Sequence, residues 1–124
     1  MSPYDRTRLE HISEALKLAL QFAQGRKRSD LETDTMLVFA PIRAIEIVGE
    51  AASRMSPEGR AELSDLPCPL MIGMRNRLAH AYFDVDLDIL WDTVTRAVPP
   101  VARRVDELLE DRGMATGLRK SLRG

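Results

Sequence analysis

The sequence predicts an all-α protein, an up-and-down bundle of four to five helices. Apolar residues recur at steps of three and four along most of the chain, which is the period of a helix with one buried face. No stretch shows the two-residue alternation that is typical of a strand. With 124 residues, 44% hydrophobic and 30% charged, the chain has the size and balance of one folded domain. We assign this domain to residues 1–112 and expect a basic, flexible tail over residues 113–124.

The first predicted helix spans residues 5–24. Its apolar side chains would face the core, and they are Leu9, Ile12, Leu16, Ala19, Leu20 and Ala23. Gly25 suits the end of this helix. The three residues that follow, Arg26-Lys27-Arg28, are typical of a solvated basic segment at a helix end, with a phosphate contact as the alternative.

The second predicted helix is longer and opens at Asp30 or Thr33, because both residue types cap helix N-termini. It runs to about Met55. Glu46 and Glu50 lie four residues apart on one face of it, close to the apolar seam. They are either two solvated carboxylates or a pair in which one faces an arginine of the third helix and supports it.

The second half of the chain predicts three more helical segments. Residues 56–69 are rich in turn formers and allow one short helical piece. The third full helix begins near Pro69 and runs to about His80. Asp86 caps a fourth helix, which Pro99-Pro100 ends, and a fifth helix follows from the proline pair.

Composition excludes several classes of protein. A net charge of −1 excludes binding of polyanions through a global basic field, so a nucleic-acid site must be a local cluster. The single cysteine, Cys68, suits a reducing cytoplasm, and without ligand partners nearby it is expected to be a packed thiol. We therefore expect no metal and no cofactor. The charged N-terminus excludes a signal peptide and no apolar run reaches membrane-spanning length, which predicts a cytoplasmic protein with no membrane partner.

One stretch, residues 72–83, carries most of the polar chemistry. Its polar members are Arg75, Asn76, Arg77, His80 and Tyr82. Arginine with histidine suits cleavage of RNA, whose own 2′-hydroxyl is the nucleophile. Histidine titrates near neutral pH and can serve as base or acid, whereas arginine binds phosphate oxygens through a charged, planar fork. Spacing alone leaves open that these side chains serve an interface or a helix cap.

Helix geometry limits how these groups can meet. Asn76 and His80 share one face, whereas Arg75 points about 140° away from His80. Arg75 and His80 meet if the helix ends at His80 and turns the imidazole round, or if two copies face each other across a twofold axis. Arg77 is a further cation that could contact RNA or pair with an acid, and His11 is expected to be a surface residue.

The string Arg75-Asn76-Arg77-Leu78-Ala79-His80-Ala81-Tyr82 resembles the Arg-x4-His-x-Tyr motif of the HEPN superfamily, specifically of the HepT-like toxins. The resemblance continues upstream in residues 47–51 and downstream in residues 84–92 and Pro99-Pro100, in the family's order. It covers most of residues 5–110.

The resemblance implies an all-α HEPN fold and a homodimer with the motif helices at its interface. It also implies metal-independent endoribonuclease activity, with Arg75 and His80 catalytic and Asn76 as the supporting polar residue. Family toxins are encoded beside a minimal nucleotidyltransferase, the antitoxin, which transfers AMP from ATP to the motif tyrosine, here Tyr82. The alternative is a non-catalytic helical dimer that binds a nucleotide or a protein and partners a nucleotidyltransferase.

Overall fold

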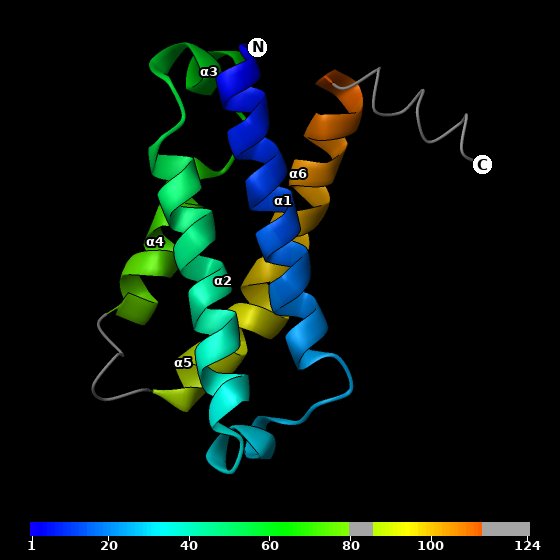
Figure 1. Ribbon diagram of the computed structural model, residues 1–124, viewed down its shortest axis with the longest axis vertical. Helices are drawn as coiled ribbons and strands as arrows, with labels where there is room; N and C mark the ends of the chain where they lie inside the picture. Colours follow the sequence, from blue (N-terminus) through cyan, green and yellow to red (C-terminus); the bar gives the residue numbers. More distant parts are fainter. Residues whose placement is uncertain (80–85, 113–124) are drawn as a thin grey trace, which may run out of the picture.

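The computed structural model describes residues 1–79 and 86–112, and these form a bundle of helices without a strand (Figure 1). In chain order the elements are α1 (Pro3–Ala23), the 3-10 helix η1 (Arg28–Glu32), α2 (Thr35–Ser53), α3 (Pro57–Glu62), α4 (Cys68–Ala79), α5 (Leu87–Asp92), the π-helical turn η2 (Thr93–Ala97) and α6 (Val98–Arg112). The predicted all-α bundle is confirmed. The predicted tail, residues 113–124, lies outside the described residues, so the domain boundary stays a prediction.

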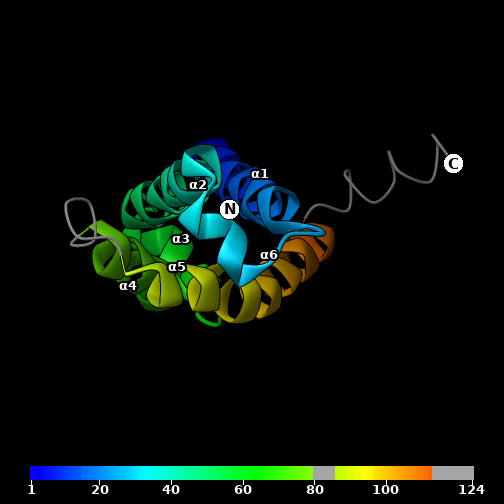
Figure 2. The same cartoon turned by 90° about the horizontal axis from the view of Figure 1, so that it is seen from below.

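The long helices alternate in direction and form two layers. α1 and α2 lie side by side in one layer, while α4, α5 and α6 form the other (Figures 1 and 2). α2 packs against both α1 and α4, and α1 also packs against α6. α2 is therefore the central support of the bundle, with α1 on one side and α4 on the other.

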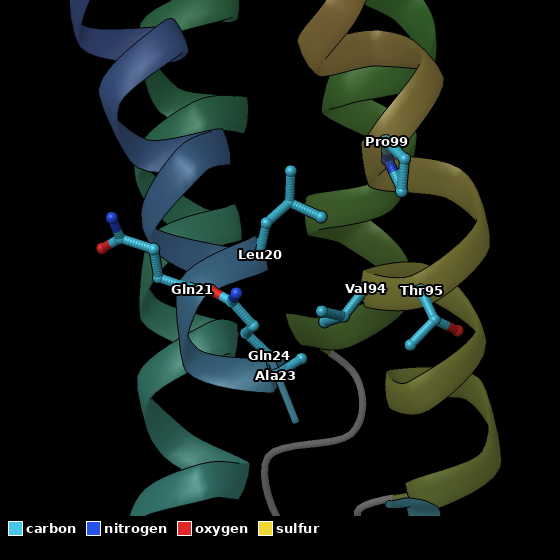
Figure 3. A pocket seen from close by; sticks show the side chains of 7 residues that line it. All are labelled: Leu20, Gln21, Ala23, Gln24, Val94, Thr95 and Pro99. Atoms are coloured by element: carbon cyan, nitrogen blue, oxygen red, sulfur yellow. The ribbon is translucent and has the colours of Figure 1, made fainter. Parts of the chain in front are cut away.

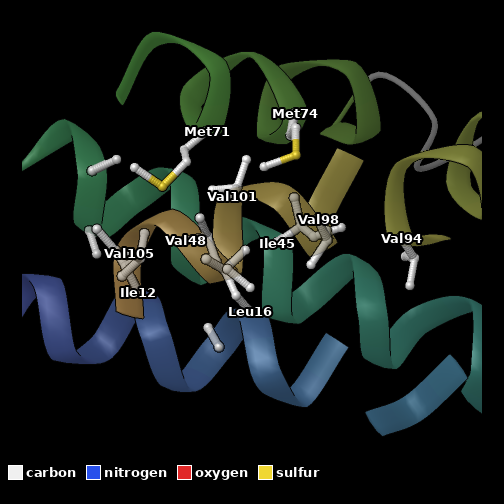
Figure 4. Close-up of a cluster of buried hydrophobic side chains, with 14 of the residues drawn as sticks. Ile12, Leu16, Ile45, Val48, Met71, Met74, Val94, Val98, Val101 and Val105 are labelled. Atoms are coloured by element: carbon white, nitrogen blue, oxygen red, sulfur yellow. The ribbon is translucent and has the colours of Figure 1, made fainter. Parts of the chain in front are cut away.

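The core lies between the two layers (Figure 4). Every long helix contributes fully or almost fully buried apolar side chains to it, among them Ile12, Leu16, Ile45, Val48, Met71, Met74, Val98 and Val105. Burial of each such side chain stabilises the fold by about 1.5–3 kcal/mol, before the entropy of ordering the chain is subtracted. The apolar faces predicted from sequence are the faces that pack.

The start of α2 differs from the prediction. Its N-cap is Asp34, whose carboxylate accepts a hydrogen bond from the backbone N–H of Leu37 at 3.2 Å. Asp30 belongs to η1 instead, where it accepts the N–H of Lys27 at 2.8 Å. The two predicted openings of the second helix therefore belong to η1, Asp30 inside it and Thr33 at its C-cap. Asp86 caps α5 as predicted, by accepting two backbone N–H groups.

The predicted break at Pro99-Pro100 is wrong. Helical structure is continuous from α5 through η2 into α6. Prolines lack the N–H that an α-helix needs and crowd the carbonyls one turn earlier. The chain accommodates them with a wider π turn, in which the Val98 N–H bonds the Thr93 carbonyl five residues back. Such a turn absorbs the prolines without ending the helix.

Candidate functional site

α4 carries the candidate site and presents two different sides. Met71, Met74 and Leu78 are buried at helical spacing and fix this side of α4 to the core. Asn76 and Arg77 are exposed, and Arg75 lies half-buried on the flank between these sides. The packing of the apolar residues therefore determines which way the polar residues of α4 face.

Gly49 of α2 allows α4 to approach closely at Arg75. A Cβ atom on Gly49 would overlap the Cβ of Arg75 and would lie 2.8 Å from its Cδ. The aliphatic stem of Arg75 thus crosses the backbone of α2, and its guanidinium group is carried outward. Glycine inside a helix costs up to about 1 kcal/mol relative to alanine, so this position has a packing reason. Gly49 lies in residues 47–51, where the family resemblance continues, and its role depends on the packing of α2 against α4.

The guanidinium group of Arg75 contacts its neighbour on α4. Its Nε and Nη2 donate to the Oδ1 of Asn76 at 3.4 and 3.3 Å, at the long end of the hydrogen-bond range. Among the described residues no carboxylate forms an ion pair with Arg75 or with Arg77. The structure therefore brings Arg75 and Asn76 together, and it gives no support to an acidic partner for Arg77.

The two glutamates of α2 pair within their own helix. An oxygen of Glu46 lies 3.5 Å from Arg43, and Glu50 lies 3.0 Å from Arg54. In the described part of the chain neither faces an arginine of α4 as an ion pair, so the solvated alternative holds for the exposed Glu50. The second oxygen of Glu46 is buried and has no hydrogen-bond partner within residues 1–79 and 86–112.

His80 and Tyr82 lie outside the described residues. α4 is described as far as Ala79, the residue directly before the histidine. The meeting of Arg75 with His80 and the modification of Tyr82 therefore stay predictions.

A hollow of about 360 Å³ lies between the end of α1 and the η2–α6 junction (Figure 3). Its described lining residues are Leu20, Gln21, Ala23, Gln24, Val94, Thr95 and Pro99. None of these side chains ionises near neutral pH, so they offer no general acid or base and no cation for phosphate. This hollow is therefore not a candidate catalytic site.

A second hollow, of about 180 Å³, lies between α1 and α2. Its lining residues are Arg8, His11, Ile47, Glu50, Ala51 and Arg54. His11 is exposed, as predicted. This cluster has no signal in the sequence, because its charged members come from two helices that are far apart along the chain.

Other predicted features can be located directly. Cys68 is buried, and burial raises the pKa of its thiol, so the predicted packed thiol is confirmed. Within the described ranges no three His, Cys, Asp or Glu side chains lie close enough together to hold a metal ion. No described helix combines the length and apolar composition that crossing a membrane requires.

Comparison with known proteins identifies the family. The family model described as "Ribonuclease HepT-like" matches residues 12–108. A protein of Thermococcus cleftensis named "Probable ribonuclease HepT" is 36% identical over 100 residues, which cover 81% of this chain and 91% of that protein.

Two further relatives agree. A protein of Caldanaerobacter subterraneus subsp. tengcongensis, named provisionally as an RNase, is 33% identical over 105 residues, or 85% of this chain and 94% of the relative. A similarly named protein of Methanocaldococcus jannaschii is 32% identical over 98 residues, 79% of this chain and 90% of its own length. No solved structure gives a significant match. The chain belongs to the HepT-like ribonuclease family of the HEPN superfamily.

Proposed function

We propose that this protein is a toxin that cleaves RNA internally, through Arg75 and His80, at the interface of a homodimer. The observation that carries the proposal is the state of the two motif arginines. Arg75 and Arg77 have no carboxylate partner among the described residues, although most arginines elsewhere are ion-paired. Unneutralised guanidinium groups on an outward side suit the phosphates of RNA.

The reaction needs no nucleophile from the protein. The 2′-oxygen of the ribose forms a bond to the adjacent phosphorus, the bond from phosphorus to the 5′-oxygen breaks, and a 2′,3′-cyclic phosphate is left. His80 takes the 2′ proton or gives one to the leaving 5′-oxygen. Arg75 stabilises the negative charge that develops on the phosphate oxygens. Asn76, within hydrogen-bond range of Arg75, restricts the orientation of the guanidinium group.

Two copies of α4 related by a twofold axis would bring the Arg75 of one chain to the His80 of the other, so that the dimer holds two such pairs. Exposed apolar side chains on α2 and α4 support self-association, because such groups favour burial: Met36 is 79%, Phe39 46% and Leu70 50% exposed. We expect the interface to bury about 1,200 Å² or more.

We further propose that a minimal nucleotidyltransferase neutralises the toxin. The phenol oxygen of Tyr82 attacks the α-phosphorus of ATP, the bond to the β-phosphate oxygen breaks, and pyrophosphate leaves while the phenol proton is lost. The bound AMP adds bulk and negative charge two residues after His80, which would repel a substrate phosphate.

Growth of bacteria tests the proposed activity. Wild type, Arg75→Ala and His80→Ala are expressed without a partner, and growth and RNA integrity are compared. We expect arrest and RNA cleavage with wild type and relief with both variants. Equal growth in all three would favour the non-catalytic binding module.

The ends of the cleaved RNA test the proposed reaction, and the mass of the co-expressed protein tests its neutralisation by the nucleotidyltransferase. Cleaved RNA should carry 2′,3′-cyclic phosphate ends, and 2′-deoxy substitution at the cut site should block cleavage. Co-expression with the neighbouring nucleotidyltransferase should restore growth and add the mass of one AMP group at Tyr82. Full neutralisation of Tyr82→Phe by that partner would contradict adenylylation as the mechanism.

A further inference from the structure

The hollow between α1 and α2 has no place in the reaction described above. We propose that it binds a backbone phosphate of the RNA strand, at a position away from the bond that is cut. This inference rests on the proposed ribonuclease function and adds a substrate-binding site to it. At about 180 Å³ the hollow has room for several water-sized groups, each of which takes roughly 30 Å³ in liquid.

Arg8 provides the strongest evidence for a missing ligand. Its Nε is buried and has no hydrogen-bond partner among the described residues. The guanidinium carbon lies 4.8 Å from the centre of the Tyr4 ring, so the ring holds the charged group in position. A buried donor without an acceptor costs free energy. Arg8 lines the hollow, so a phosphate oxygen bound there would supply an acceptor to its guanidinium group.

The charges around the hollow favour an anion. Arg8 and Arg54 carry two positive charges, and Glu50, 3.0 Å from Arg54, carries one negative charge. His11 adds a ring N–H that can donate a hydrogen bond. The balance is one positive charge with His11 neutral, which suits the single negative charge of a phosphodiester better than a carboxylate-rich or apolar ligand.

The position of the hollow suits a strand that also reaches Arg75. Gly49 faces the stem of Arg75 on α4, and the next two residues, Glu50 and Ala51, line the hollow on the α1 side. The two sites therefore lie on opposite sides of one turn of α2. A helix with its side chains is about 10–12 Å across. A strand of RNA that crosses α2 would thus have one phosphate at Arg75 and another in the hollow.

Binding of an uncleavable RNA tests the proposal. An oligonucleotide of about eight residues with 2′-O-methyl groups throughout lacks the nucleophile, so wild type can be measured directly. We expect Arg8→Gln to weaken binding more than Arg54→Gln, because Arg54 is already paired with Glu50. Arg8→Gln should also reduce the slope of log affinity against log salt by about 0.7, the value for one phosphate contact to a single strand. Arg103→Gln, the same change on the exposed side of α6, should leave both quantities unchanged.

Two further measurements distinguish a loss of RNA binding from structural damage caused by the substitutions. Glu50→Gln removes the one negative charge of the hollow and should tighten binding, an outcome that structural damage would not give. In cleavage assays Arg8→Gln should raise KM for long RNA and leave kcat unchanged, because only uniform binding is lost. Cleavage of a dinucleotide, too short to span α2, should be unaffected.

The outcomes distinguish this inference from the function on which it rests. If wild type neither binds nor cleaves RNA, both the proposed function and this inference are wrong. If it cleaves RNA but Arg8→Gln and Arg54→Gln match Arg103→Gln in affinity and salt slope, the inference alone is wrong. If these variants weaken self-association in sedimentation instead, the hollow is a protein interface and the inference is also wrong.

Discussion

Two short stretches of this chain look alike in sequence and differ in structure. Arg26-Lys27-Arg28 precedes and enters η1, and its arginines are ion-paired. Arg26 lies 2.8 Å from Asp34, and Arg28 lies 2.7 Å from Asp88. The arginines of this predicted solvated segment are therefore ion-paired, and they join the connection after α1 to the starts of α2 and α5.

Arg75-Asn76-Arg77 of α4 contrasts with this. Arg75 contacts the amide oxygen of Asn76, and within the described residues neither arginine has a carboxylate partner. Both stretches carry two arginines, so the number of arginines does not separate them. The arginines of the first stretch are ion-paired and join elements, whereas Arg75 and Arg77 have no carboxylate partner among the described residues and can contact an anion.

The largest expected effect is on cleavage. Arg75→Ala should lower kcat about 10²- to 10³-fold, the cost of removing one group that stabilises charge in the transition state. Arg26→Ala removes the same charge from the paired stretch and should leave kcat close to wild type. RNA cleavage under single-turnover conditions measures both, and equal losses would remove the distinction between the stretches.

The next effect concerns the glycine that supports Arg75. Gly49→Ala should destabilise the fold by about 1–3 kcal/mol, because α2 and α4 must separate to admit a methyl group. Gly73→Ala is the matched control, since a Cβ there meets no atom within 4 Å. It should stabilise α4 by up to about 1 kcal/mol. Urea unfolding measures both, and equal stabilities would contradict the close approach at Gly49.

A smaller effect is expected on RNA binding. In a His80→Ala background, Arg77→Gln should reduce the slope of log affinity against log salt by about 0.7, the effect of losing one phosphate contact. Arg28→Gln should leave the slope unchanged, because Arg28 is already paired with Asp88. A change of slope for Arg28→Gln alone would reverse the comparison.

The smallest effect depends on pH. The hydrogen bond from Arg26 is the main cause that lowers the pKa of Asp34. A lowered folded-state pKa contributes stability above the unfolded value, about 3.9, and this is lost as the pH falls through the folded value. Asp34→Asn should therefore be less stable than wild type near pH 7, with a difference that disappears at low pH. A constant difference from pH 7 to pH 2 would contradict the ion pair as its cause.

Most of the fold was predictable because helical periodicity is a local signal. Apolar steps of three and four located the long helices, and the cap at Asp86 followed a local rule. The predicted helix end at Pro99-Pro100 was wrong, because the effect of the prolines depends on whether the chain can form a π turn between α5 and α6. The predicted start of the second helix, at Asp30 or Thr33, was also wrong, because these residues belong to η1 and its C-cap and α2 begins after Asp34.

The candidate site was predictable only in part. Residue identity and family resemblance pointed to Arg75 and Asn76, and these two do lie together. The role of Gly49 and the hollow at Arg8 were not predictable, because both depend on pairs of helices whose distance is set by packing. The alternative in which Glu46 or Glu50 faces an arginine of α4 has no support among the described residues, where the two glutamates lie beside Arg43 and Arg54 instead.

The most direct test of the account is a mixture of two inactive variants, Arg75→Ala and His80→Ala, purified as a tagged heterodimer. In a twofold dimer with sites shared between subunits, this heterodimer keeps one site with an intact arginine from one chain and an intact histidine from the other. The account predicts that the purified heterodimer recovers about half of the wild-type cleavage rate per dimer. A heterodimer as inactive as either parent would contradict a site shared between subunits.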